Sequence, residues 1–475
     1  MTRGCDVVII GAGANGLAAA AYLARAGCRV VVAEAQNKAG GLCRSIKLDE
    51  TFTAPLAHTL YALDPRVLKE LKLASRGLKF AARDMPLVGL RADGKHLVLT
   101  RDNHATARSI AAHSQADAKA WKPFRRELFS LARAMRALWW EEGAARDPRI
   151  EPLIRMSAAA FLDSWFESDA LKAALAFDAT DGGLSLIEPG SALVLVWRAA
   201  QEMCGLQAAA ATLARGPEIL TETLAEAALA AGAEIRTGAR VAKILVAEGA
   251  ANGVELQSGE RIPARFVLSS LTRRQTFRAL LPEGDGGFAQ DFASPRTGGA
   301  IVSLALKSFP EFAGSAVPRN GRFIVAERLE TYISAHSAAA AGRLPDELTL
   351  EFTIPTIADT SLAPLGQHVV SVLVRPAPLS ADKTQLESKV IAALNRAAPG
   401  FSSQIAAREM LTQSDISARC GVEADATGIA RLSANWRERL ATSIRGLMIL
   451  EEPVTAISGR AGRIAANIVA KEKAT

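Results

Sequence analysis

The chain has 475 residues, of which 49% are hydrophobic and 22% are charged, and this composition of a folded globular protein excludes a disordered or collagen-like chain. Because one hydrophobic core rarely serves so many residues, we expect two or three closely packed units. The formal net charge of +7 comes from basic residues scattered along the chain, a pattern that argues against nucleic-acid binding.

The first predicted elements are a strand, a glycine-rich turn and a helix. Residues 6–10 form a short β-branched apolar run, and Gly-Ala-Gly-Ala-Asn-Gly follows at 11–16, before a helical pattern over 17–26. A second strand over 29–33 ends at Glu34, at about the 20-residue distance where a carboxylate meets a ribose in dinucleotide-binding folds. The spacing predicts a nucleotide-binding βαβ unit.

The residues of this turn have separate expected roles. Gly11 makes the tight turn, Gly13 lets the backbone approach a pyrophosphate, and Gly16 lets the helix pack closely on the strand. The helix begins around Ala14 and Asn15, where unpaired N–H groups and a partial positive charge favour an anion. We therefore expect the pyrophosphate of a dinucleotide at this helix end.

The next segment favours FAD as the dinucleotide. Glu34 is expected to accept hydrogen bonds from ribose hydroxyls, and its charge disfavours the 2′-phosphate of NADP. Beyond Ala35, a basic loop carries a second glycine pair, Gly40 and Gly41, which lets the chain pass close to the ribityl and pyrophosphate region. Arg44 is then available to a phosphate or a flavin carbonyl. The alternative is a solvated turn with an exposed Arg44.

Further blocks along the chain carry a family resemblance. They are residues 57–61 with Asp64 and Pro65, 97–99 with Asp102, 114–121, 156–165, 189–192, 232–237 and 362–368. In this order they resemble the phytoene-desaturase-like FAD-dependent oxidoreductases, in the subgroup called pyridine nucleotide-disulphide oxidoreductase domain-containing protein 2. The resemblance spans nearly the whole chain. It implies an α/β fold in which a Rossmann-type FAD/NAD(P)-binding domain is interleaved with an α+β substrate domain, and the oxidation of apolar substrates.

The middle of the chain agrees with this resemblance. Residues 240–247, 252–256 and 265–269 alternate like a β-meander that returns to the nucleotide sheet. By resemblance, Val241 lies against the adenine, and Ser269 and Ser270 lie close by, with Ser269 taken as the cofactor-binding residue of the two. In the alternative interpretation, Val241 is an ordinary strand residue.

The resemblance also implies the domain boundaries. We expect residues 1–65, 210–280 and 430–475 to form the FAD-binding domain. Residues 66–209 form a helical part and residues 281–429 a strand-rich part of the substrate domain. A ligand between the two domains would lie at the carboxyl ends of the parallel strands.

Candidates for the chemistry itself are few. No histidine belongs to a Ser/His/Asp or Cys/His signature, so hydrolysis by a nucleophile has no support, and no ligand cluster predicts a metal site. His58 and Tyr61 are the candidates for a catalytic role, because the block that contains them lies near the substrate side of the flavin in this architecture. An ordinary core role is the alternative for both residues.

Three segments depart from the family pattern, all near the expected flavin ring. Residues 446–459 lack most of the expected glycines and carry Glu451 and Glu452, whose charge would oppose the pyrophosphate and a reduced flavin. The other departures lie at 207–220 and 421–444. Two hypotheses follow. The chain is an FAD-dependent oxidoreductase that takes hydride from an apolar substrate, or a catalytically weakened subunit that pairs with a complete paralogue.

A basic amphipathic helix predicted over 118–142 bears on partners and location. Its apolar stripe either enters a membrane interface and admits an apolar substrate, or packs as core or as a contact in a homo- or hetero-oligomer. The five cysteines form no Cys-x-x-Cys pair, and no apolar run is long enough to span a bilayer. We expect a cytoplasmic protein, with peripheral membrane contact left open.

Overall fold

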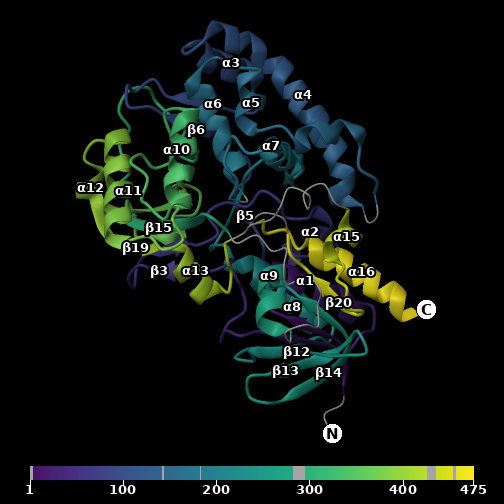
Figure 1. Cartoon of the computed structure of the whole chain (residues 1–475). Coiled ribbons are helices and arrows are strands. Elements are labelled where there is room, and N and C mark those ends of the chain that lie inside the picture. Colours follow the sequence, from purple (N-terminus) through teal and green to yellow (C-terminus); the bar gives the residue numbers. More distant parts are fainter. Residues whose placement is uncertain are drawn as a thin grey trace.

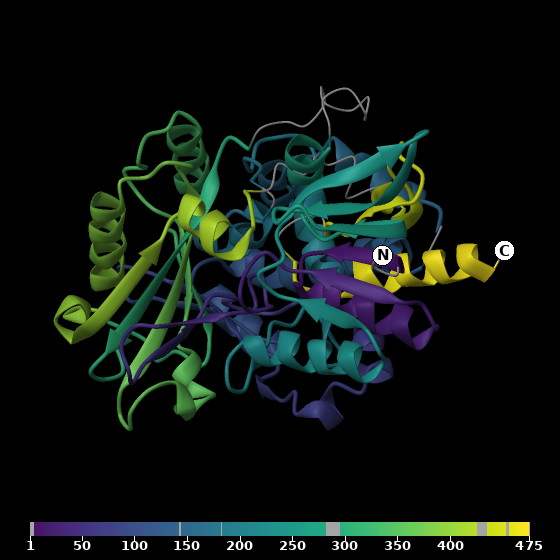
Figure 2. The same ribbon diagram turned by 90° about the horizontal axis from the view of Figure 1, so that it is seen from below.

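The structure is a computed structural model, and it describes residues 4–141, 144–181, 183–281, 295–424, 435–452 and 456–474. Within these residues, two seven-stranded sheets organise the molecule, and a group of helices lies above them in Figure 1. Figure 2 shows the two sheets from below, one toward each side of the molecule. The fold class is therefore mixed α/β, as the sequence predicted.

The first sheet joins strands that lie far apart in the chain. In spatial order it contains β11 (Glu234–Arg236), β2 (Val30–Ala33), β1 (Cys5–Ile10), β14 (Arg261–Ser269), β13 (Ala250–Leu256) and β12 (Val241–Ala247), with β20 (Leu447–Ile449) beside β14. β11, β2, β1, β14 and β20 pair in parallel, and β12, β13 and the start of β14 form an antiparallel meander. These strands come from the three stretches expected to form the FAD-binding domain. The boundaries of that domain stay a prediction.

Three helices hold the βαβ unit together. Helix α1 (Ala14–Arg25) packs against both α8 (Glu218–Ala230) and α16 (Arg460–Ala474). Gly462 of α16 faces the backbone of Asn15, and a Cβ at position 462 would lie well inside 3.0 Å of the Asn15 carbonyl oxygen. This close approach brings the start of α16 next to the glycine-rich turn.

The second sheet is mostly antiparallel. In spatial order it contains β19 (Ile405–Leu411), β15 (Gly298–Leu306), β18 (His368–Ala377), β17 (Leu350–Thr353), β16 (Arg322–Val325), β6 (Leu87–Leu90) and β7 (Leu97–Leu99). Only β16 and β6, among the described strands of this sheet, pair in parallel. The expected strand-rich part is present, but β6 and β7 join it from the stretch that we expected to be helical. The sequence did not indicate this pairing, because both strands are short and lie far from their partners in the chain.

Helices and short elements complete the fold. The longer or clustered helices are α3 (Asn103–Ala111), α4 (Gln115–Trp140), α5 (Ala158–Asp163), α6 (Asp169–Ala176), α7 (Ser191–Ala200), α9 (Arg273–Leu280), α10 (Leu329–Ala340), α11 (Lys383–Ala397) and α13 (Gln413–Cys420). The short elements are α2 (Pro65–Glu70), α12 (Phe401–Gln404), α15 (Trp436–Leu440), β3 (Ser45–Lys47), β4 (Thr53–Pro55), β5 (Phe80–Ala82), β8 (Glu202–Met203), β9 (Leu206–Gln207) and β10 (Thr212–Leu213). Helices α3 to α7 form the upper group in Figure 1.

The apolar stripe of α4 belongs to the core. The helix begins at the Ser114 cap, whose Oγ accepts from Asp117 N at 3.0 Å. Phe124 and Met135 of the stripe are fully buried, and α4 packs on α7 and α3. Of the two alternatives for this stripe, the structure contains the packed one. No described helix is both long and apolar enough to cross a bilayer.

Candidate functional site

A cavity of about 520 Å³ opens beside the βαβ unit, and we call it the βαβ cavity. It extends from the ends of β1 and β2 past the start of α1 to residues that precede α16. Nine of the predicted cofactor-binding residues line it: Gly11, Gly13, Ala14, Asn15, Glu34, Ala35, Gly40, Gly41 and Val241. The fold thus brings segments around 11–15, 34–41 and 241 to one cavity.

The three glycines of the turn differ in what surrounds them. Gly11 has φ of +91°, a conformation that favours glycine. A Cβ on Gly13 would meet no described atom within 4 Å, so the space in front of Gly13 belongs to the cavity. A Cβ on Gly16 would lie well inside 3.0 Å of the Gly11 carbonyl oxygen. These surroundings match the turn, the open approach and the close packing that the sequence predicted.

Glu34 is held at the end of β2 by backbone donors. Its carboxylate accepts from Ala12 N at 2.7 Å and from Gln36 N at 2.8 Å, and the residue is only 8% exposed. Each carboxylate oxygen has two lone pairs, so both oxygens keep a lone pair for a further donor. Since Glu34 also lines the βαβ cavity, a ribose hydroxyl in this cavity can be that donor.

Three predicted residues lie outside the lining of the βαβ cavity. Gly16 packs under the turn, and the Arg44 guanidinium donates to the Lys38 carbonyl oxygen. Ser269 is fully buried, and its Oγ pairs with Thr276 Oγ1 at 2.8 Å. These placements give no support to the adenine-side role predicted for Ser269 or to the phosphate or flavin contact predicted for Arg44.

Of the two serines expected near the adenine, Ser270 is the one that lines the βαβ cavity. Ser270 lines the cavity and donates to the Ile10 carbonyl oxygen at 2.9 Å. Successive side chains of an extended chain point to opposite sides, so a one-residue difference decides which serine reaches the cavity.

The far end of the βαβ cavity carries a buried carboxylate. Glu452 lines it and is 7% exposed. Its Oε1 accepts from Ser458 Oγ and, at 3.2 Å, from Ala461 N in the first turn of α16. Among the described residues, no hydrogen-bond partner faces Oε2. Burial raises the pKa of Glu452, although Arg460 opposes that shift. The sequence indicated a charge here but not that it caps α16. Residues 453–455 and 425–434 of the departing segments lie outside the described residues.

A second cavity of about 160 Å³ continues from the first, and we call it the inner cavity. Leu42, Val422, Glu423 and Ile457 line both cavities. Apolar side chains from several elements surround the inner cavity, including Leu56, Phe177, Leu184, Leu186, Ile301, Leu373 and Ile416. The inner cavity therefore adjoins the part of the βαβ cavity that Leu42 and Ile457 line.

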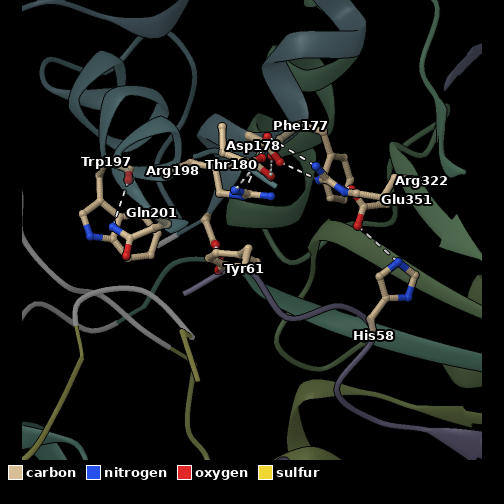
Figure 3. A network of polar contacts seen from close by, with 12 residues as sticks. His58, Tyr61, Phe177, Asp178, Thr180, Trp197, Arg198, Gln201, Arg322 and Glu351 are labelled. Atoms are coloured by element: carbon tan, nitrogen blue, oxygen red, sulfur yellow. Dashed lines mark hydrogen bonds and ion pairs between the residues drawn. The ribbon is translucent and has the colours of Figure 1, made fainter. Parts of the chain in front are cut away.

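A buried network of ion pairs forms one wall of the inner cavity (Figure 3). Arg322 lies between Asp178 and Glu351 and bonds to both carboxylates, to Asp178 at 2.6 Å. Asp181 accepts from the Arg375 guanidinium. The Nε of Arg198 lies 3.9 Å from Asp178 Oδ2. The network thus balances three carboxylates with three guanidinium groups.

Both candidate catalytic residues line the inner cavity and contact this network. His58 Nδ1 lies 3.1 Å from Ser371 Oγ, and its Nε2 lies 3.2 Å from Glu351 Oε1. The Tyr61 hydroxyl donates to Asp181, and burial raises the pKa of Tyr61 well above its ordinary value. The tyrosine is therefore a neutral donor, and His58 is held by two partners. Their catalytic role stays a prediction.

Sequence reasoning missed the rest of the network. They come from a helical region and three strands and are spread over nearly 200 residues: Asp178, Asp181, Arg198, Arg322, Glu351 and Arg375. No local motif marks them. The available signal was charge inside apolar strands, such as Glu351 within the buried strand β17, because a charge at such a position needs a partner.

Comparison with known proteins identifies relatives over most of the chain. The family model described as flavin containing amine oxidoreductase matches residues 15–274. Pyridine nucleotide-disulfide oxidoreductase domain-containing protein 2 of Rattus norvegicus is 30% identical over 474 residues, which cover 86% of this chain and 82% of that protein. Hydroxyneurosporene desaturase of Cereibacter sphaeroides is 28% identical, over 72% of this chain and 70% of its own.

Two further matches concern assembly and fold. One of the subunits of limonene dehydrogenase from Castellaniella defragrans is 28% identical, over 59% of this chain and 54% of its own. A solved structure of wild-type putrescine oxidase bound to putrescine has a TM-score of 0.67 and 17% identity, and the match covers 99% of both chains. At that identity the likeness concerns the fold alone.

Proposed function

Because the chain belongs to the flavin-containing amine oxidoreductase family, we propose that it oxidises an apolar organic substrate in the inner cavity by hydride transfer to FAD. That it is an FAD-dependent oxidoreductase follows from the family itself. The same relatives bear out the predicted resemblance to the phytoene-desaturase-like group. The class of substrate and the place of oxidation are the proposal.

The residues of the βαβ cavity fit FAD. The open space in front of Gly13 and the amides at the start of α1 suit the pyrophosphate, which needs close donors and no side chain. Glu34 has the position and the spare acceptors for the ribose hydroxyls. When bound, FAD supplies a hydride acceptor, and the protein supplies position and electrostatics.

One observation carries the proposed substrate class. The charged side chains of the network bond to one another, and apolar side chains make up much of the remaining lining. A cationic amine in the inner cavity would need a carboxylate that its own guanidinium partner does not already neutralise. The paired charges therefore favour a substrate without a charge near the reacting carbon.

Part of the wall of the inner cavity is shielded from solvent. Its lining residues His58, Arg322 and Glu351 are each less than 10% exposed. Hydride transfer needs a dry site, since water would compete for reactive intermediates. Tyr61 is neutral because its pKa is raised, and its hydroxyl, which donates to Asp181, forms part of the cavity wall.

The test is anaerobic reduction of the protein-bound flavin. We expect purified protein to carry FAD that dithionite reduces, and we expect apolar terpene hydrocarbons or their alcohols to bleach the flavin absorbance. Putrescine and cyclohexylamine serve as the amine comparison. Bleaching by amines without bleaching by apolar compounds would contradict the proposed substrate class.

A second candidate is a weakened subunit that pairs with a complete paralogue. It is favoured by the Glu452 carboxylate at the far end of the βαβ cavity, and one relative is named as a subunit of limonene dehydrogenase. For such a subunit, isolated protein would be inert toward every substrate and would gain activity only when mixed with its paralogue. Activity of the isolated chain would exclude this candidate.

Replacing Glu452 by glutamine is expected to strengthen FAD binding. The amide oxygen of the glutamine can still accept from Ala461 N, whereas the negative charge beside the cofactor is lost. Removing this repulsion, worth about 1 kcal/mol, raises the affinity for FAD about fivefold. Since the pKa of Glu452 is raised, the wild-type carboxyl ionises only as the pH rises above the ordinary value of 4.5. Titration of FAD fluorescence should show wild-type affinity falling as the pH rises and a flatter profile for Glu452→Gln. Parallel profiles would show that Glu452 does not face the cofactor.

A further inference from the structure

The inner cavity shares its charged wall with a third cavity of about 200 Å³, which we call the α4 cavity. Trp121, Phe124 and Leu128 of α4 line the α4 cavity. Asp178, Arg198 and Arg322 line both the inner cavity and the α4 cavity. These three residues therefore form a charged partition between two largely apolar spaces.

Arg198 has more unused donors than Arg322, the other cation of this partition, which lacks an acceptor only at its Nε among the described residues. It is 3% exposed, and its one described hydrogen bond runs from Nη1 to the Ala208 carbonyl oxygen at 3.3 Å. No hydrogen-bond acceptor among the described residues serves its Nε or Nη2. The nearest carboxylate oxygen, Asp178 Oδ2, lies 3.9 Å from Arg198 Nε, because the short hydrogen bond of Asp178 goes to Arg322.

The guanidinium of Arg198 is nevertheless fixed in place. It lies over the Tyr61 ring, 4.3 Å from the centroid, and Figure 3 shows it in the middle of the network. Buried donors without an acceptor are costly, and a ligand that supplies the acceptor recovers that cost. The position of Arg198 therefore indicates a binding point for an oxygen atom of the ligand.

The charge balance indicates which oxygen. Asp178, Asp181 and Glu351 already match the three guanidinium groups, so a carboxylate or phosphate would add an uncompensated buried charge. A carbonyl or hydroxyl oxygen accepts a hydrogen bond without adding charge. A neutral oxygen is therefore the acceptor that this site accommodates.

We propose that Arg198 binds a carbonyl or hydroxyl oxygen of the substrate, while the apolar body of the substrate occupies the inner cavity. This inference rests on the proposed function, because it takes the inner cavity as the substrate site. It narrows the substrate class to apolar molecules with one neutral oxygen. Arg198 is a binding residue in this scheme and takes no part in the transfer of hydride.

The experiment compares two probes that share a ring skeleton, namely limonene, a hydrocarbon, and carvone, which carries a carbonyl group. Binding to the FAD-loaded protein is followed by tryptophan fluorescence, since Trp197 packs edge-on against Tyr61 with ring centroids 6.0 Å apart. We expect carvone to bind about tenfold to a hundredfold more tightly than limonene, the range for a hydrogen bond to a charged group.

Two variants test the assignment. Arg198→Met retains the apolar stem and should abolish the preference for carvone, while Asp178 keeps its bond to Arg322. Arg136→Met is the matched control, because Arg136 pairs with Glu202 at 2.7 Å and lines neither the inner nor the α4 cavity. It should leave the preference unchanged. If Arg198→Met does not fold, Arg198→Lys, which keeps the charge but loses the guanidinium fork, should reduce the preference.

The outcomes separate this inference from the proposed function. If limonene binds to the wild-type protein and carvone binds no more tightly, Arg198 does not bind the oxygen, and the apolar substrate class stands. If Arg198→Met still binds carvone more tightly than limonene, Arg198 likewise does not bind the oxygen, and the apolar substrate class stands. If neither probe binds to the FAD-loaded protein, the proposed substrate class fails, and with it the role of Arg198.

Discussion

Gly13→Val is expected to remove FAD from the protein without unfolding it. The valine side chain would extend into the space that the pyrophosphate needs, since a Cβ at Gly13 meets no described atom within 4 Å. If the variant loses two hydrogen bonds from backbone amides to the phosphates, each worth about 1.5–3 kcal/mol, the affinity for FAD falls by at least about a hundredfold. Gly13 has φ of −79°, which valine also adopts. Flavin content after purification and a Kd from fluorescence titration measure the effect.

Gly16→Ala is the matched comparison. Its Cβ would clash with the Gly11 carbonyl oxygen inside the turn, so it should lower the free energy of unfolding by about 1–3 kcal/mol. Gly13→Val should leave the unfolding midpoint of the apoprotein nearly unchanged. If Gly13→Val retains stoichiometric FAD, the pyrophosphate does not bind at the start of α1, and the assignment of the βαβ cavity fails.

Arg322→Met is expected to have the largest effect on stability. Arg322 is 7% exposed and bonds to Asp178 and Glu351, so its removal leaves the buried Glu351 carboxylate and the partly buried Asp178 carboxylate without their main partner. Removing one member of a buried ion pair costs about 3–5 kcal/mol. Urea unfolding followed by circular dichroism measures this loss. The surface variant Arg149→Met is the control, since Arg149 is 55% exposed and its partner Asp147 is partly exposed, and such pairs contribute about 0–1 kcal/mol.

The same network makes the protein sensitive to acid. Burial by itself would raise the pKa of Glu351, but Arg322 and His58 more than offset burial and hold this pKa far below the usual 4.5. A depressed pKa stabilises the fold above the ordinary value, and this stabilisation is lost as the pH falls below it. The free energy of unfolding of the wild type, measured by urea unfolding at a series of pH values, should therefore fall steeply below about pH 4.5. A pH dependence in Arg322→Met as steep as in the wild type would contradict the role of Arg322.

The βαβ unit was predictable because its signals are local. Glycine spacing, an apolar strand and the terminal Glu34 lie within 30 residues, and each has a direct physical role in the turn. Ser269 shows the limit of such reasoning. The strand was expected correctly, but which of two adjacent serines faces the cavity depends on the register of β14 against β1.

The charged network was not predictable because its signals are not local. Asp178 and Arg198 lie in the helical part of the chain, whereas Glu351 lies in β17 of the second sheet, more than 150 residues further along. His58 and Tyr61 were identified through a family resemblance, which gave their neighbourhood but not their partners. The long-range pairing of β6 with β16, which helps to bring the helical part to the network, likewise has no counterpart in the local sequence.

The lining shared by the βαβ cavity and the inner cavity has a consequence for maturation. Leu42 and Ile457 border both spaces, so under the proposed function the residues that would hold FAD and those that would hold the substrate share part of one wall. Ligand recognition would then depend on loading with FAD, and substrate affinity would be a property of the holoprotein.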